Sequence, residues 1–206
     1  MQVVKFKQVL ISGFLLWLFS VVGTTLVAIT WQSTADRIAV NEKKVLLRNL
    51  HALLPPDRMD NDITQDTLEI APSPLLGTHQ VTLAWRARKH QQPVAIVLNA
   101  VAPGGYNGDI YLLVGIYVDA SIAGVRVVKH NETPGLGDGI EVRKSDWILG
   151  FNGKSLQHPS LEQWKVQRDG GDFDQMTGAT ITPRAVVSAV KNALLYYRQN
   201  SQRLFQ

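Results

Sequence analysis

The chain has 206 residues, of which 45% are hydrophobic and 18% charged, a length that suits one ordinary domain with a smaller additional segment. It contains no cysteine, which excludes disulfide bonds, iron–sulfur clusters, Cys-ligated zinc and thiol nucleophiles. The formal net charge is +4, and no run of basic residues is interleaved with aromatic ones, so the sequence gives no indication of nucleic-acid binding.

A long apolar segment near the N-terminus predicts a membrane anchor. Lys7 and Asp36 are separated by 28 uncharged residues, and the segment Val9–Trp31 is rich in Leu, Val, Ile and Phe. A helix over these 23 residues is about 35 Å long, enough to cross a hydrocarbon core of about 30 Å. The alternative is a cleaved signal peptide, whose apolar part is typically about 7 to 15 residues long. We therefore expect residues 1–35 to form one transmembrane helix that is retained.

The charges that flank this helix leave its orientation open. Lys5 and Lys7 precede it, whereas four basic residues follow it within residues 37–48. A simple application of the positive-inside rule would place the C-terminal side in the cytoplasm. However, more than 150 residues follow the helix, and large domains translocate largely regardless of their charge.

Residues 36–77 are predicted to form a helical stalk and a connector. Apolar residues recur at helical spacing between Asp36 and Leu54, and Pro55 with Pro56 ends this pattern. The following residues, 57–77, are acidic, contain two prolines and are only weakly apolar. We expect them to connect the stalk to a separate domain over residues 78–206.

Hydrophobic residues with a period of two predict an antiparallel sheet in that domain. In residues 79–88, Val81, Leu83, Trp85 and Ala87 alternate with Thr82, Ala84, Arg86 and Arg88, which is typical of a half-buried strand. Three further apolar strands are expected at Pro93–Val101, Ile110–Val118 and Ile122–Val128, the last two joined by a short turn. Consecutive short strands of this kind favour an antiparallel meander.

A helix is predicted to close the chain. Thr182 and Pro183 are suited to the N-cap and first turn, and apolar residues follow at helical spacing from Ala185 to Tyr197. The predicted fold class is therefore α+β, with one N-terminal transmembrane helix followed by a soluble domain of an antiparallel sheet and flanking helices.

Glycine is concentrated in the loops where a ligand would lie. Thirteen of the 16 glycines fall between Gly104 and Gly178. Three segments in this part of the chain are candidates for a binding loop: 103–108, 130–138 and 174–180. Each segment has an alternative interpretation as an ordinary turn, and Tyr106 in the first of them could simply fill the core.

Two enzymatic interpretations of these segments find little support. Gly135–Gly139 resembles half of a dinucleotide fingerprint but lacks the third spaced glycine. His130 and Glu132 supply only two potential metal ligands, and the other histidines are scattered. No serine-nucleophile motif or pair of catalytic carboxylates is recognisable. We expect no metal site and no catalytic side chain.

The third segment suggests a phosphate site. Thr177-Gly178-Ala179-Thr180 places two hydroxyl groups beside small residues, immediately before the predicted helix. A helix N-terminus offers unpaired N–H groups and the positive end of the helix dipole, which favour a bound phosphate. The alternative is that Thr180 and Thr182 merely cap the helix. Capping does not require small neighbours, which leave room for a bulky phosphorylated group.

These residues carry a resemblance to known families. Asp174–Thr180 (DQMTGAT) resembles the D-x-x-[S/T]-G-A-[S/T] flavinylation motif of FMN-binding domains, whose last residue is linked to FMN through a phosphoester. The longer segments His130–Asp138, Asp146–Leu156 and Asp169–Val187 are similar to the RnfG family, the G subunits of Rnf-type ion-translocating electron transport complexes. They favour this family over the homologous C subunits of the sodium-pumping NADH:quinone oxidoreductase.

The resemblance implies a covalent flavoprotein. A flavin transferase would attach FMN to Thr180, and further cofactor-binding residues would be Thr177, Gly178, Ala179, Thr182, Glu132, Thr133, Gly135 and Leu136. It also implies an inner-membrane protein with a periplasmic C-terminal domain. That domain would relay electrons among the other subunits of the complex, coupling electron transfer between ferredoxin and NAD to ion transport. A membrane-tethered, non-redox binding or scaffold module is the alternative, in which the 177–180 segment would be only a helix cap.

Overall fold

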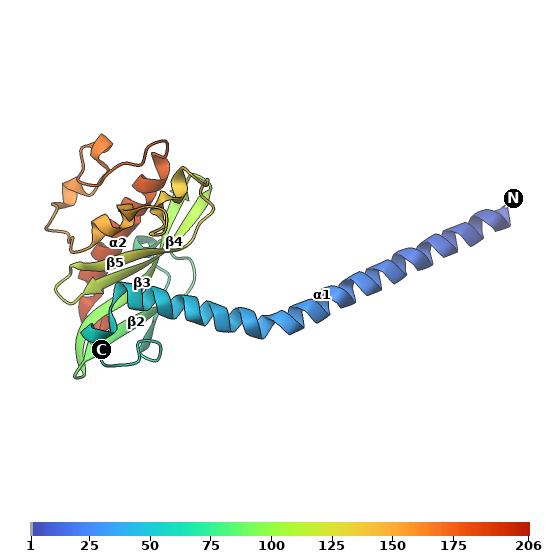
Figure 1. Cartoon of the computed structure of the whole chain (residues 1–206), viewed down its shortest axis with the longest axis horizontal. Helices are drawn as coiled ribbons and strands as arrows, with labels where there is room; N and C mark the ends of the chain where they lie inside the picture. The colour runs from blue at the N-terminus through green and yellow to red at the C-terminus, as the bar shows by residue number, and fades with distance from the viewer. Residues whose placement is uncertain (1) are drawn as a thin grey trace. The chain divides into compact units, whose positions relative to one another are not determined.

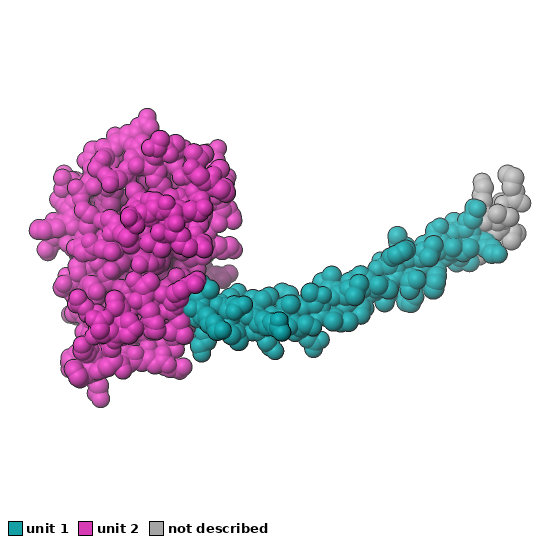
Figure 2. Space-filling view, in the orientation of Figure 1, with its two compact units in different colours: residues 1–46 teal, residues 47–206 magenta. Residues whose placement is uncertain are grey.

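The computed structural model describes residues 2–206, with side chains from residue 7 onward. Two compact units make up the chain, Met1–Leu46 and Leu47–Gln206 (Figure 2). The first unit is helical throughout its described part. The second contains the sheet and the helix that follows it.

Helix α1, Gln2–Leu53, is the first element (Figure 1). It is long and apolar enough to cross a membrane, and its apolar window has no buried residues. The anchor and the stalk helix, predicted as separate elements, are therefore one helix. Residues 2–53 contain no proline, so the helix runs on without a break. It ends before Pro55 and Pro56 because proline cannot continue the backbone hydrogen-bond pattern. The last turn belongs to the second unit, where Leu50 and Leu53 are buried.

The sheet is an antiparallel meander of five strands in the order β1-β2-β3-β4-β5 (Figure 1). The strands are β1 Thr67–Ile70, β2 Thr82–Lys89, β3 Gln92–Gly105, β4 Gly108–Tyr117 and β5 Ile122–Lys129. The predicted meander of the last four is confirmed. Strand β1 lies within the residues that were predicted as a connector, and so does the short 3-10 helix η2, Pro74–Leu76.

Side chains are buried on both faces of the sheet. Helix α2, Ile181–Leu204, packs on one face, where Ile96, Leu98 and Val114 belong to the main hydrophobic core. Residues of the opposite parity, such as Val97 and Leu113, are also buried. On that face a Cβ added to Gly124 would meet Leu53 Cδ2 at 3.0 Å, so the end of α1 lies directly against the sheet.

The two-sided burial overturns the predicted alternation in β2. Ala84, Trp85 and Ala87 are all buried, whereas Leu83 is 42% exposed. Ala84 belongs to the main core that α2 covers, and the neighbouring residues Trp85 and Ala87 point to the other face of the sheet. The single-faced alternation expected for a strand with one solvated side was therefore wrong here.

Short 3-10 helices replace regular structure between β5 and α2. They are η3 Gly137–Ile140, η4 Asp146–Phe151, η5 Leu161–Gln163 and η6 Gln167–Asp169; a further one, η1 Pro56–Arg58, follows α1. The rings of Phe151, Trp164 and Phe173 stack with centroids 4.7 to 6.2 Å apart. These aromatic side chains belong to the main hydrophobic core, so they attach the segment to the rest of the domain.

Candidate functional site

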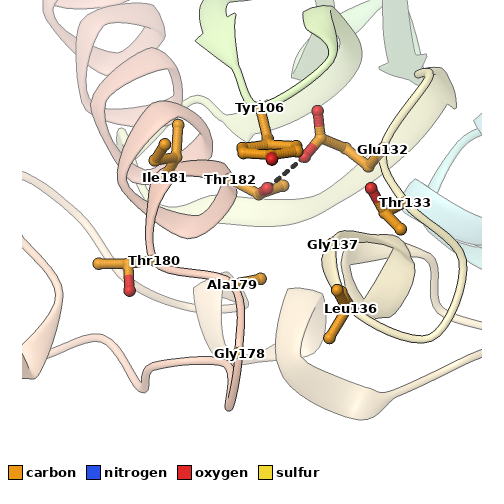
Figure 3. A pocket seen from close by; sticks show the side chains of 10 residues that line it. All are labelled: Tyr106, Glu132, Thr133, Leu136, Gly137, Gly178, Ala179, Thr180, Ile181 and Thr182. Carbon is orange, nitrogen blue, oxygen red and sulfur yellow. Dashed lines mark hydrogen bonds between the residues drawn. The ribbon is translucent and has the colours of Figure 1, made fainter.

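A cavity of about 440 Å³ lies where three glycine-containing segments meet (Figure 3). The segments are the β3–β4 turn, the loop after β5 and the start of α2. The lining residues are Tyr106, Glu132, Thr133, Leu136, Gly137, Gly178, Ala179, Thr180, Ile181 and Thr182. The volume falls within the range of about 300 to 1,000 Å³ that is usual for small-molecule sites.

Glu132 joins the three segments. Its carboxylate accepts a hydrogen bond from the hydroxyl of Thr182 at the start of α2, and another from the backbone N–H of Asn107, at 3.1 Å, in the β3–β4 turn. Glu132 and Thr182 are 4% and 1% exposed, respectively. A buried carboxylate requires such partners because burying an unpaired charge is costly. Glu132 therefore holds the walls of the cavity together.

The loop 133–138 is fixed by its own hydrogen bonds. The N–H groups of Leu136 and Gly137 both donate to the carbonyl oxygen of Thr133, each at 3.1 Å. The N–H of Gly135 donates to Asp138 Oδ1 at 2.8 Å. At Gly137, an added Cβ would lie 2.7 Å from Glu132 Oε2, so only glycine allows this carboxylate to approach the loop.

A tight turn presents the residues before α2. The N–H of Ala179 donates to the carbonyl oxygen of Met176 at 3.3 Å, and Gly178 has a φ of +80°. A Cβ on Gly178 would lie 2.9 Å from Leu136 Cδ2. The left-handed backbone conformation therefore favours glycine at this position, and the absence of a side chain leaves room for Leu136. Thr177 lies at the exposed tip of the turn and does not line the cavity.

Thr180 is a lining residue of the cavity, and its hydroxyl does not cap the helix. It occupies the N-cap position of α2, but its backbone is helical, with φ −90° and ψ −34°, and its side chain makes no capping hydrogen bond. Capping residues usually have extended backbone, which directs their oxygen to the N–H groups of the first turn. The third helical residue is Pro183, which has no N–H. The alternative interpretation, in which Thr180 merely caps the helix, is therefore wrong.

The start of α2 also differs from the prediction. The helix begins at Ile181, so Thr182 lies inside the first turn instead of at the N-cap. Its hydroxyl bonds to Glu132 and not to the helix backbone. Figure 3 shows Thr182 directed toward Glu132, and Thr180 on the other side of the turn that leads into the helix.

Three interactions fix the backbone on either side of the turn. Trp147 Nε1 donates to the carbonyl oxygen of Asp174 at 2.7 Å, and Gln167 Nε2 donates to Asp174 Oδ1 at 2.7 Å. Arg184 in the first turn of α2 forms a bidentate pair with Asp169, at 2.6 Å for both bonds. The hydrogen bond from Arg184 lowers the pKa of the Asp169 carboxyl.

The structure brings most of the predicted binding residues to the cavity, but not all of them. Thr177 and Gly135 lie outside its lining, whereas Tyr106, Gly137 and Ile181 line it and were not predicted to bind a ligand. Tyr106 is 66% exposed, so it does not fill the core. Its place in a glycine-rich hairpin turn was visible in the sequence, but nothing in the sequence joined that turn to the other two segments.

His130 supports the loop through both of its ring nitrogens. Its Nδ1 accepts a hydrogen bond from the backbone N–H of Glu132, and its Nε2 lies 3.0 Å from Glu141 Oε1. Among residues 2–206 as described, no group of three or more His, Asp or Glu side chains could hold a metal ion.

The chemistry of the cavity suits a ligand with a flat apolar part and an anionic group. Tyr106, Leu136 and Ile181 are 46 to 66% exposed and offer apolar surface around it. The N-terminus of α2 offers backbone donors and the positive end of a helix dipole. Thr180, the residue at the N-cap position of α2, also lines the cavity.

The sequence of this chain matches two family models and is similar to those of known proteins. A family model for the FMN-binding domain matches residues 105–195, which include all three segments of the cavity, and one for the RnfG N-terminal region matches residues 1–53. A protein of Shewanella oneidensis is 48% identical over 94% of this chain and 92% of its own length. Proteins of Vibrio cholerae (47%; 94% and 92%) and Pseudoalteromonas atlantica (45%; 97% and 93%) are similar to a comparable degree. All three are named as the G subunit of an ion-translocating oxidoreductase complex.

Proposed function

Because the chain belongs to the RnfG family, the G subunits of ion-translocating oxidoreductase complexes, we propose that it carries FMN covalently on Thr180 and relays electrons in a redox-driven ion pump. The observation that carries this proposal is the hydroxyl of Thr180. Thr180 is one of the residues that line a cavity inside the FMN-binding match, and its side chain makes no capping hydrogen bond. The electrons would pass between ferredoxin and NAD through the complex, and their transfer would drive ion transport across the membrane.

The residues of the cavity fit FMN. Leu136, Ile181 and Tyr106 would cover the apolar ring system and exclude water from it, and Thr133 would offer a polar contact. The backbone N–H groups at the start of α2 have no acceptor within the helix and would bind phosphate oxygens. Bound FMN supplies one-electron and two-electron redox chemistry, and the protein supplies its position and surroundings.

Attachment would be a transfer reaction catalysed by a separate flavin transferase. The oxygen of the Thr180 hydroxyl would attack the FMN phosphorus of FAD. A new O–P bond would form to Thr180, the diphosphate bond of FAD would break, AMP would leave and the hydroxyl proton would be released. Thr180 would thus be an attachment point and not a catalytic residue. Glu132, Gly178 and Ala179 shape the space around it.

Membrane attachment and orientation are part of the proposal. The apolar part of α1 would anchor the chain in the inner membrane as a single span, with Leu47–Gln206 on the periplasmic side. Fusing a reporter that is active only outside the cytoplasm after Gln206 tests this orientation. We expect an active reporter, and a stable but inactive fusion would contradict the assignment.

A pair of matched variants tests the attachment site. Thr180→Val keeps the shape of the side chain and removes its oxygen, and Thr177→Val makes the same change on the exposed tip of the turn. The full chain is expressed with the flavin transferase and separated on a denaturing gel. We expect ultraviolet fluorescence from the wild type and from Thr177→Val, and none from Thr180→Val. A fluorescent Thr180→Val band would exclude Thr180, and a dark wild-type band would favour the scaffold alternative.

A further inference from the structure

A single carboxyl lies in the wall of the cavity. Among the described residues that line it, only Glu132 carries a carboxyl or a basic group. Two glycines enclose that carboxylate, because an added Cβ would lie 2.8 Å from Oε1 at Gly105 and 2.7 Å from Oε2 at Gly137. Its oxygens accept hydrogen bonds from the backbone N–H of Asn107 and from the hydroxyl of Thr182 (Figure 3). The carboxylate is therefore held in one place by partners that carry no charge.

No cation pairs with this carboxylate. None of the ion pairs in the described part of the chain includes Glu132. His130 is its neighbour, but Nδ1 of His130 accepts the hydrogen bond from the backbone N–H of Glu132, so this nitrogen carries no proton. An imidazole with one unprotonated nitrogen is neutral. The start of α2 supplies only a partial positive charge, roughly half an elementary charge. A net negative charge therefore remains in the wall of the cavity.

The other buried carboxylate offers a contrast. Asp138 is 6% exposed, lies 3.4 Å from the Nζ atom of Lys144 and does not line the cavity. Burying a charge without a cation is costly, and the hydrogen bonds of Glu132 do not require one. A glutamine at position 132 could accept from the N–H of Asn107 and donate to the hydroxyl oxygen of Thr182. The charge itself, and not the hydrogen bonding, is what remains to be explained.

We propose that the carboxylate of Glu132 lowers the redox midpoint potential of the bound FMN. Each electron that a reductant transfers to the flavin adds one negative charge to it until a proton is taken up from water. The carboxylate opposes that charge strongly, because the effective dielectric constant inside a protein is about 20, against about 80 in water. A flavin with a lower midpoint passes its electrons on more readily. This inference rests on the proposed function and concerns the tuning of the same site.

Two matched variants test the role of the charge. Glu132→Gln removes the charge and keeps both hydrogen bonds, and Asp138→Asn makes the same change on the carboxylate that is paired with Lys144. The flavin-loaded full chain in detergent is titrated with dithionite in the presence of redox mediators, and the midpoint is obtained from the flavin absorbance. We expect Glu132→Gln to favour reduction at least tenfold, a rise of about 59 mV in the midpoint of a one-electron step. The midpoint of Asp138→Asn should stay near the wild-type value.

A cation at the rim of the cavity is the second test, used if Glu132→Gln does not fold. Asn107 is exposed, and its backbone N–H, not its side chain, bonds to Glu132. Asn107→Lys therefore keeps this bond and adds a positive charge near the carboxylate. We expect it to raise the midpoint by a smaller amount than Glu132→Gln, since an exposed charge is screened. Asn107→Gln is the uncharged control and should not raise it.

Two results would overturn the proposal. One is a wild-type midpoint in flavin-loaded Glu132→Gln, or in Asn107→Lys if the first variant does not fold. The other is an equal shift in Glu132→Gln and Asp138→Asn. Flavin attachment is read separately on a denaturing gel. A wild-type chain without FMN would contradict the proposed function, whereas a loaded Glu132→Gln chain with the wild-type midpoint would contradict only this inference.

Discussion

Thr182 and Glu132 are the buried polar pair on which the shape of the cavity depends. Thr182→Val removes the hydroxyl that donates to Glu132 and leaves that carboxylate oxygen without this partner. We expect the variant to lose about 1.5 to 3 kcal/mol of stability and part of its FMN. Thr182→Ser keeps the donor and should restore both. Thermal unfolding and bound flavin of the detergent-solubilised chain are the measurements, and a Thr182→Val protein that matches the wild type in both would contradict this role.

Individual residues of the site were predictable only where a local pattern marks them. The order of small and hydroxyl residues marked 177–180, and the glycine-rich loop marked Thr133 and Leu136. The hydrogen bond between Glu132 and Thr182 joins residues 50 positions apart, so no local pattern announces it. Tyr106 and Gly137 also line the cavity, and their role was not predictable for the same reason. It depends on segments that only folding brings together.

At the scale of elements, alternation predicted the existence of β2 and apolar runs predicted the other three longer strands, with a short turn between the last two. Strand β1 escaped prediction because its four residues lie in an acidic segment with too few residues to show a period. The start of α2 was predicted two residues too late because Thr182, followed by Pro183, is of a residue type that is common at the N-cap. Its burial and its bond to Glu132 override that preference.

Asp66 attaches β1 and the preceding loop to β2. Its carboxylate accepts from Arg86 Nε at 2.6 Å and from Arg88 Nε at 2.7 Å. Burial raises the pKa of the Asp66 carboxyl, but hydrogen bonds from Arg88 and Arg86 lower it by more, so the net pKa lies below the usual value of 3.8. A folded-state pKa below the unfolded one means that the ionised carboxylate stabilises the fold above about pH 3.8, and that this contribution is lost as the pH falls through the lowered pKa.

Asp66→Asn tests this contribution. We expect a loss of about 1 to 2 kcal/mol at pH 7, discounted because the pair is partly exposed. The difference from the wild type should shrink as the pH falls below about 4. Urea unfolding of the full chain in detergent at several pH values gives the comparison, and a difference that stays constant from pH 7 to pH 3 would refute the assignment.

At the scale of the whole molecule, the long apolar helix could be predicted from consecutive residues, whereas the cavity could not. The long apolar helix near the N-terminus was predictable because an apolar run of membrane length is a property of consecutive residues. The sheet and the closing helix followed from periodicity. The cavity did not, because it depends on how the β3–β4 turn, the loop after β5 and the start of α2 meet around Glu132. The FMN-binding family model covers all three segments of that cavity, and Thr180 is a lining residue whose side chain makes no capping hydrogen bond.

Peptide mass spectrometry of the mature chain tests the central claim most directly. Trypsin releases Asp169–Arg184 as one peptide that contains Thr177, Thr180 and Thr182, so fragmentation can assign a modification to one of the three hydroxyls. The account predicts that this peptide, from protein made with the flavin transferase, carries one FMN in phosphoester linkage on Thr180. An FMN adduct on Thr177 or Thr182, or an unmodified peptide from a preparation in which the transferase is shown to be active, would contradict it.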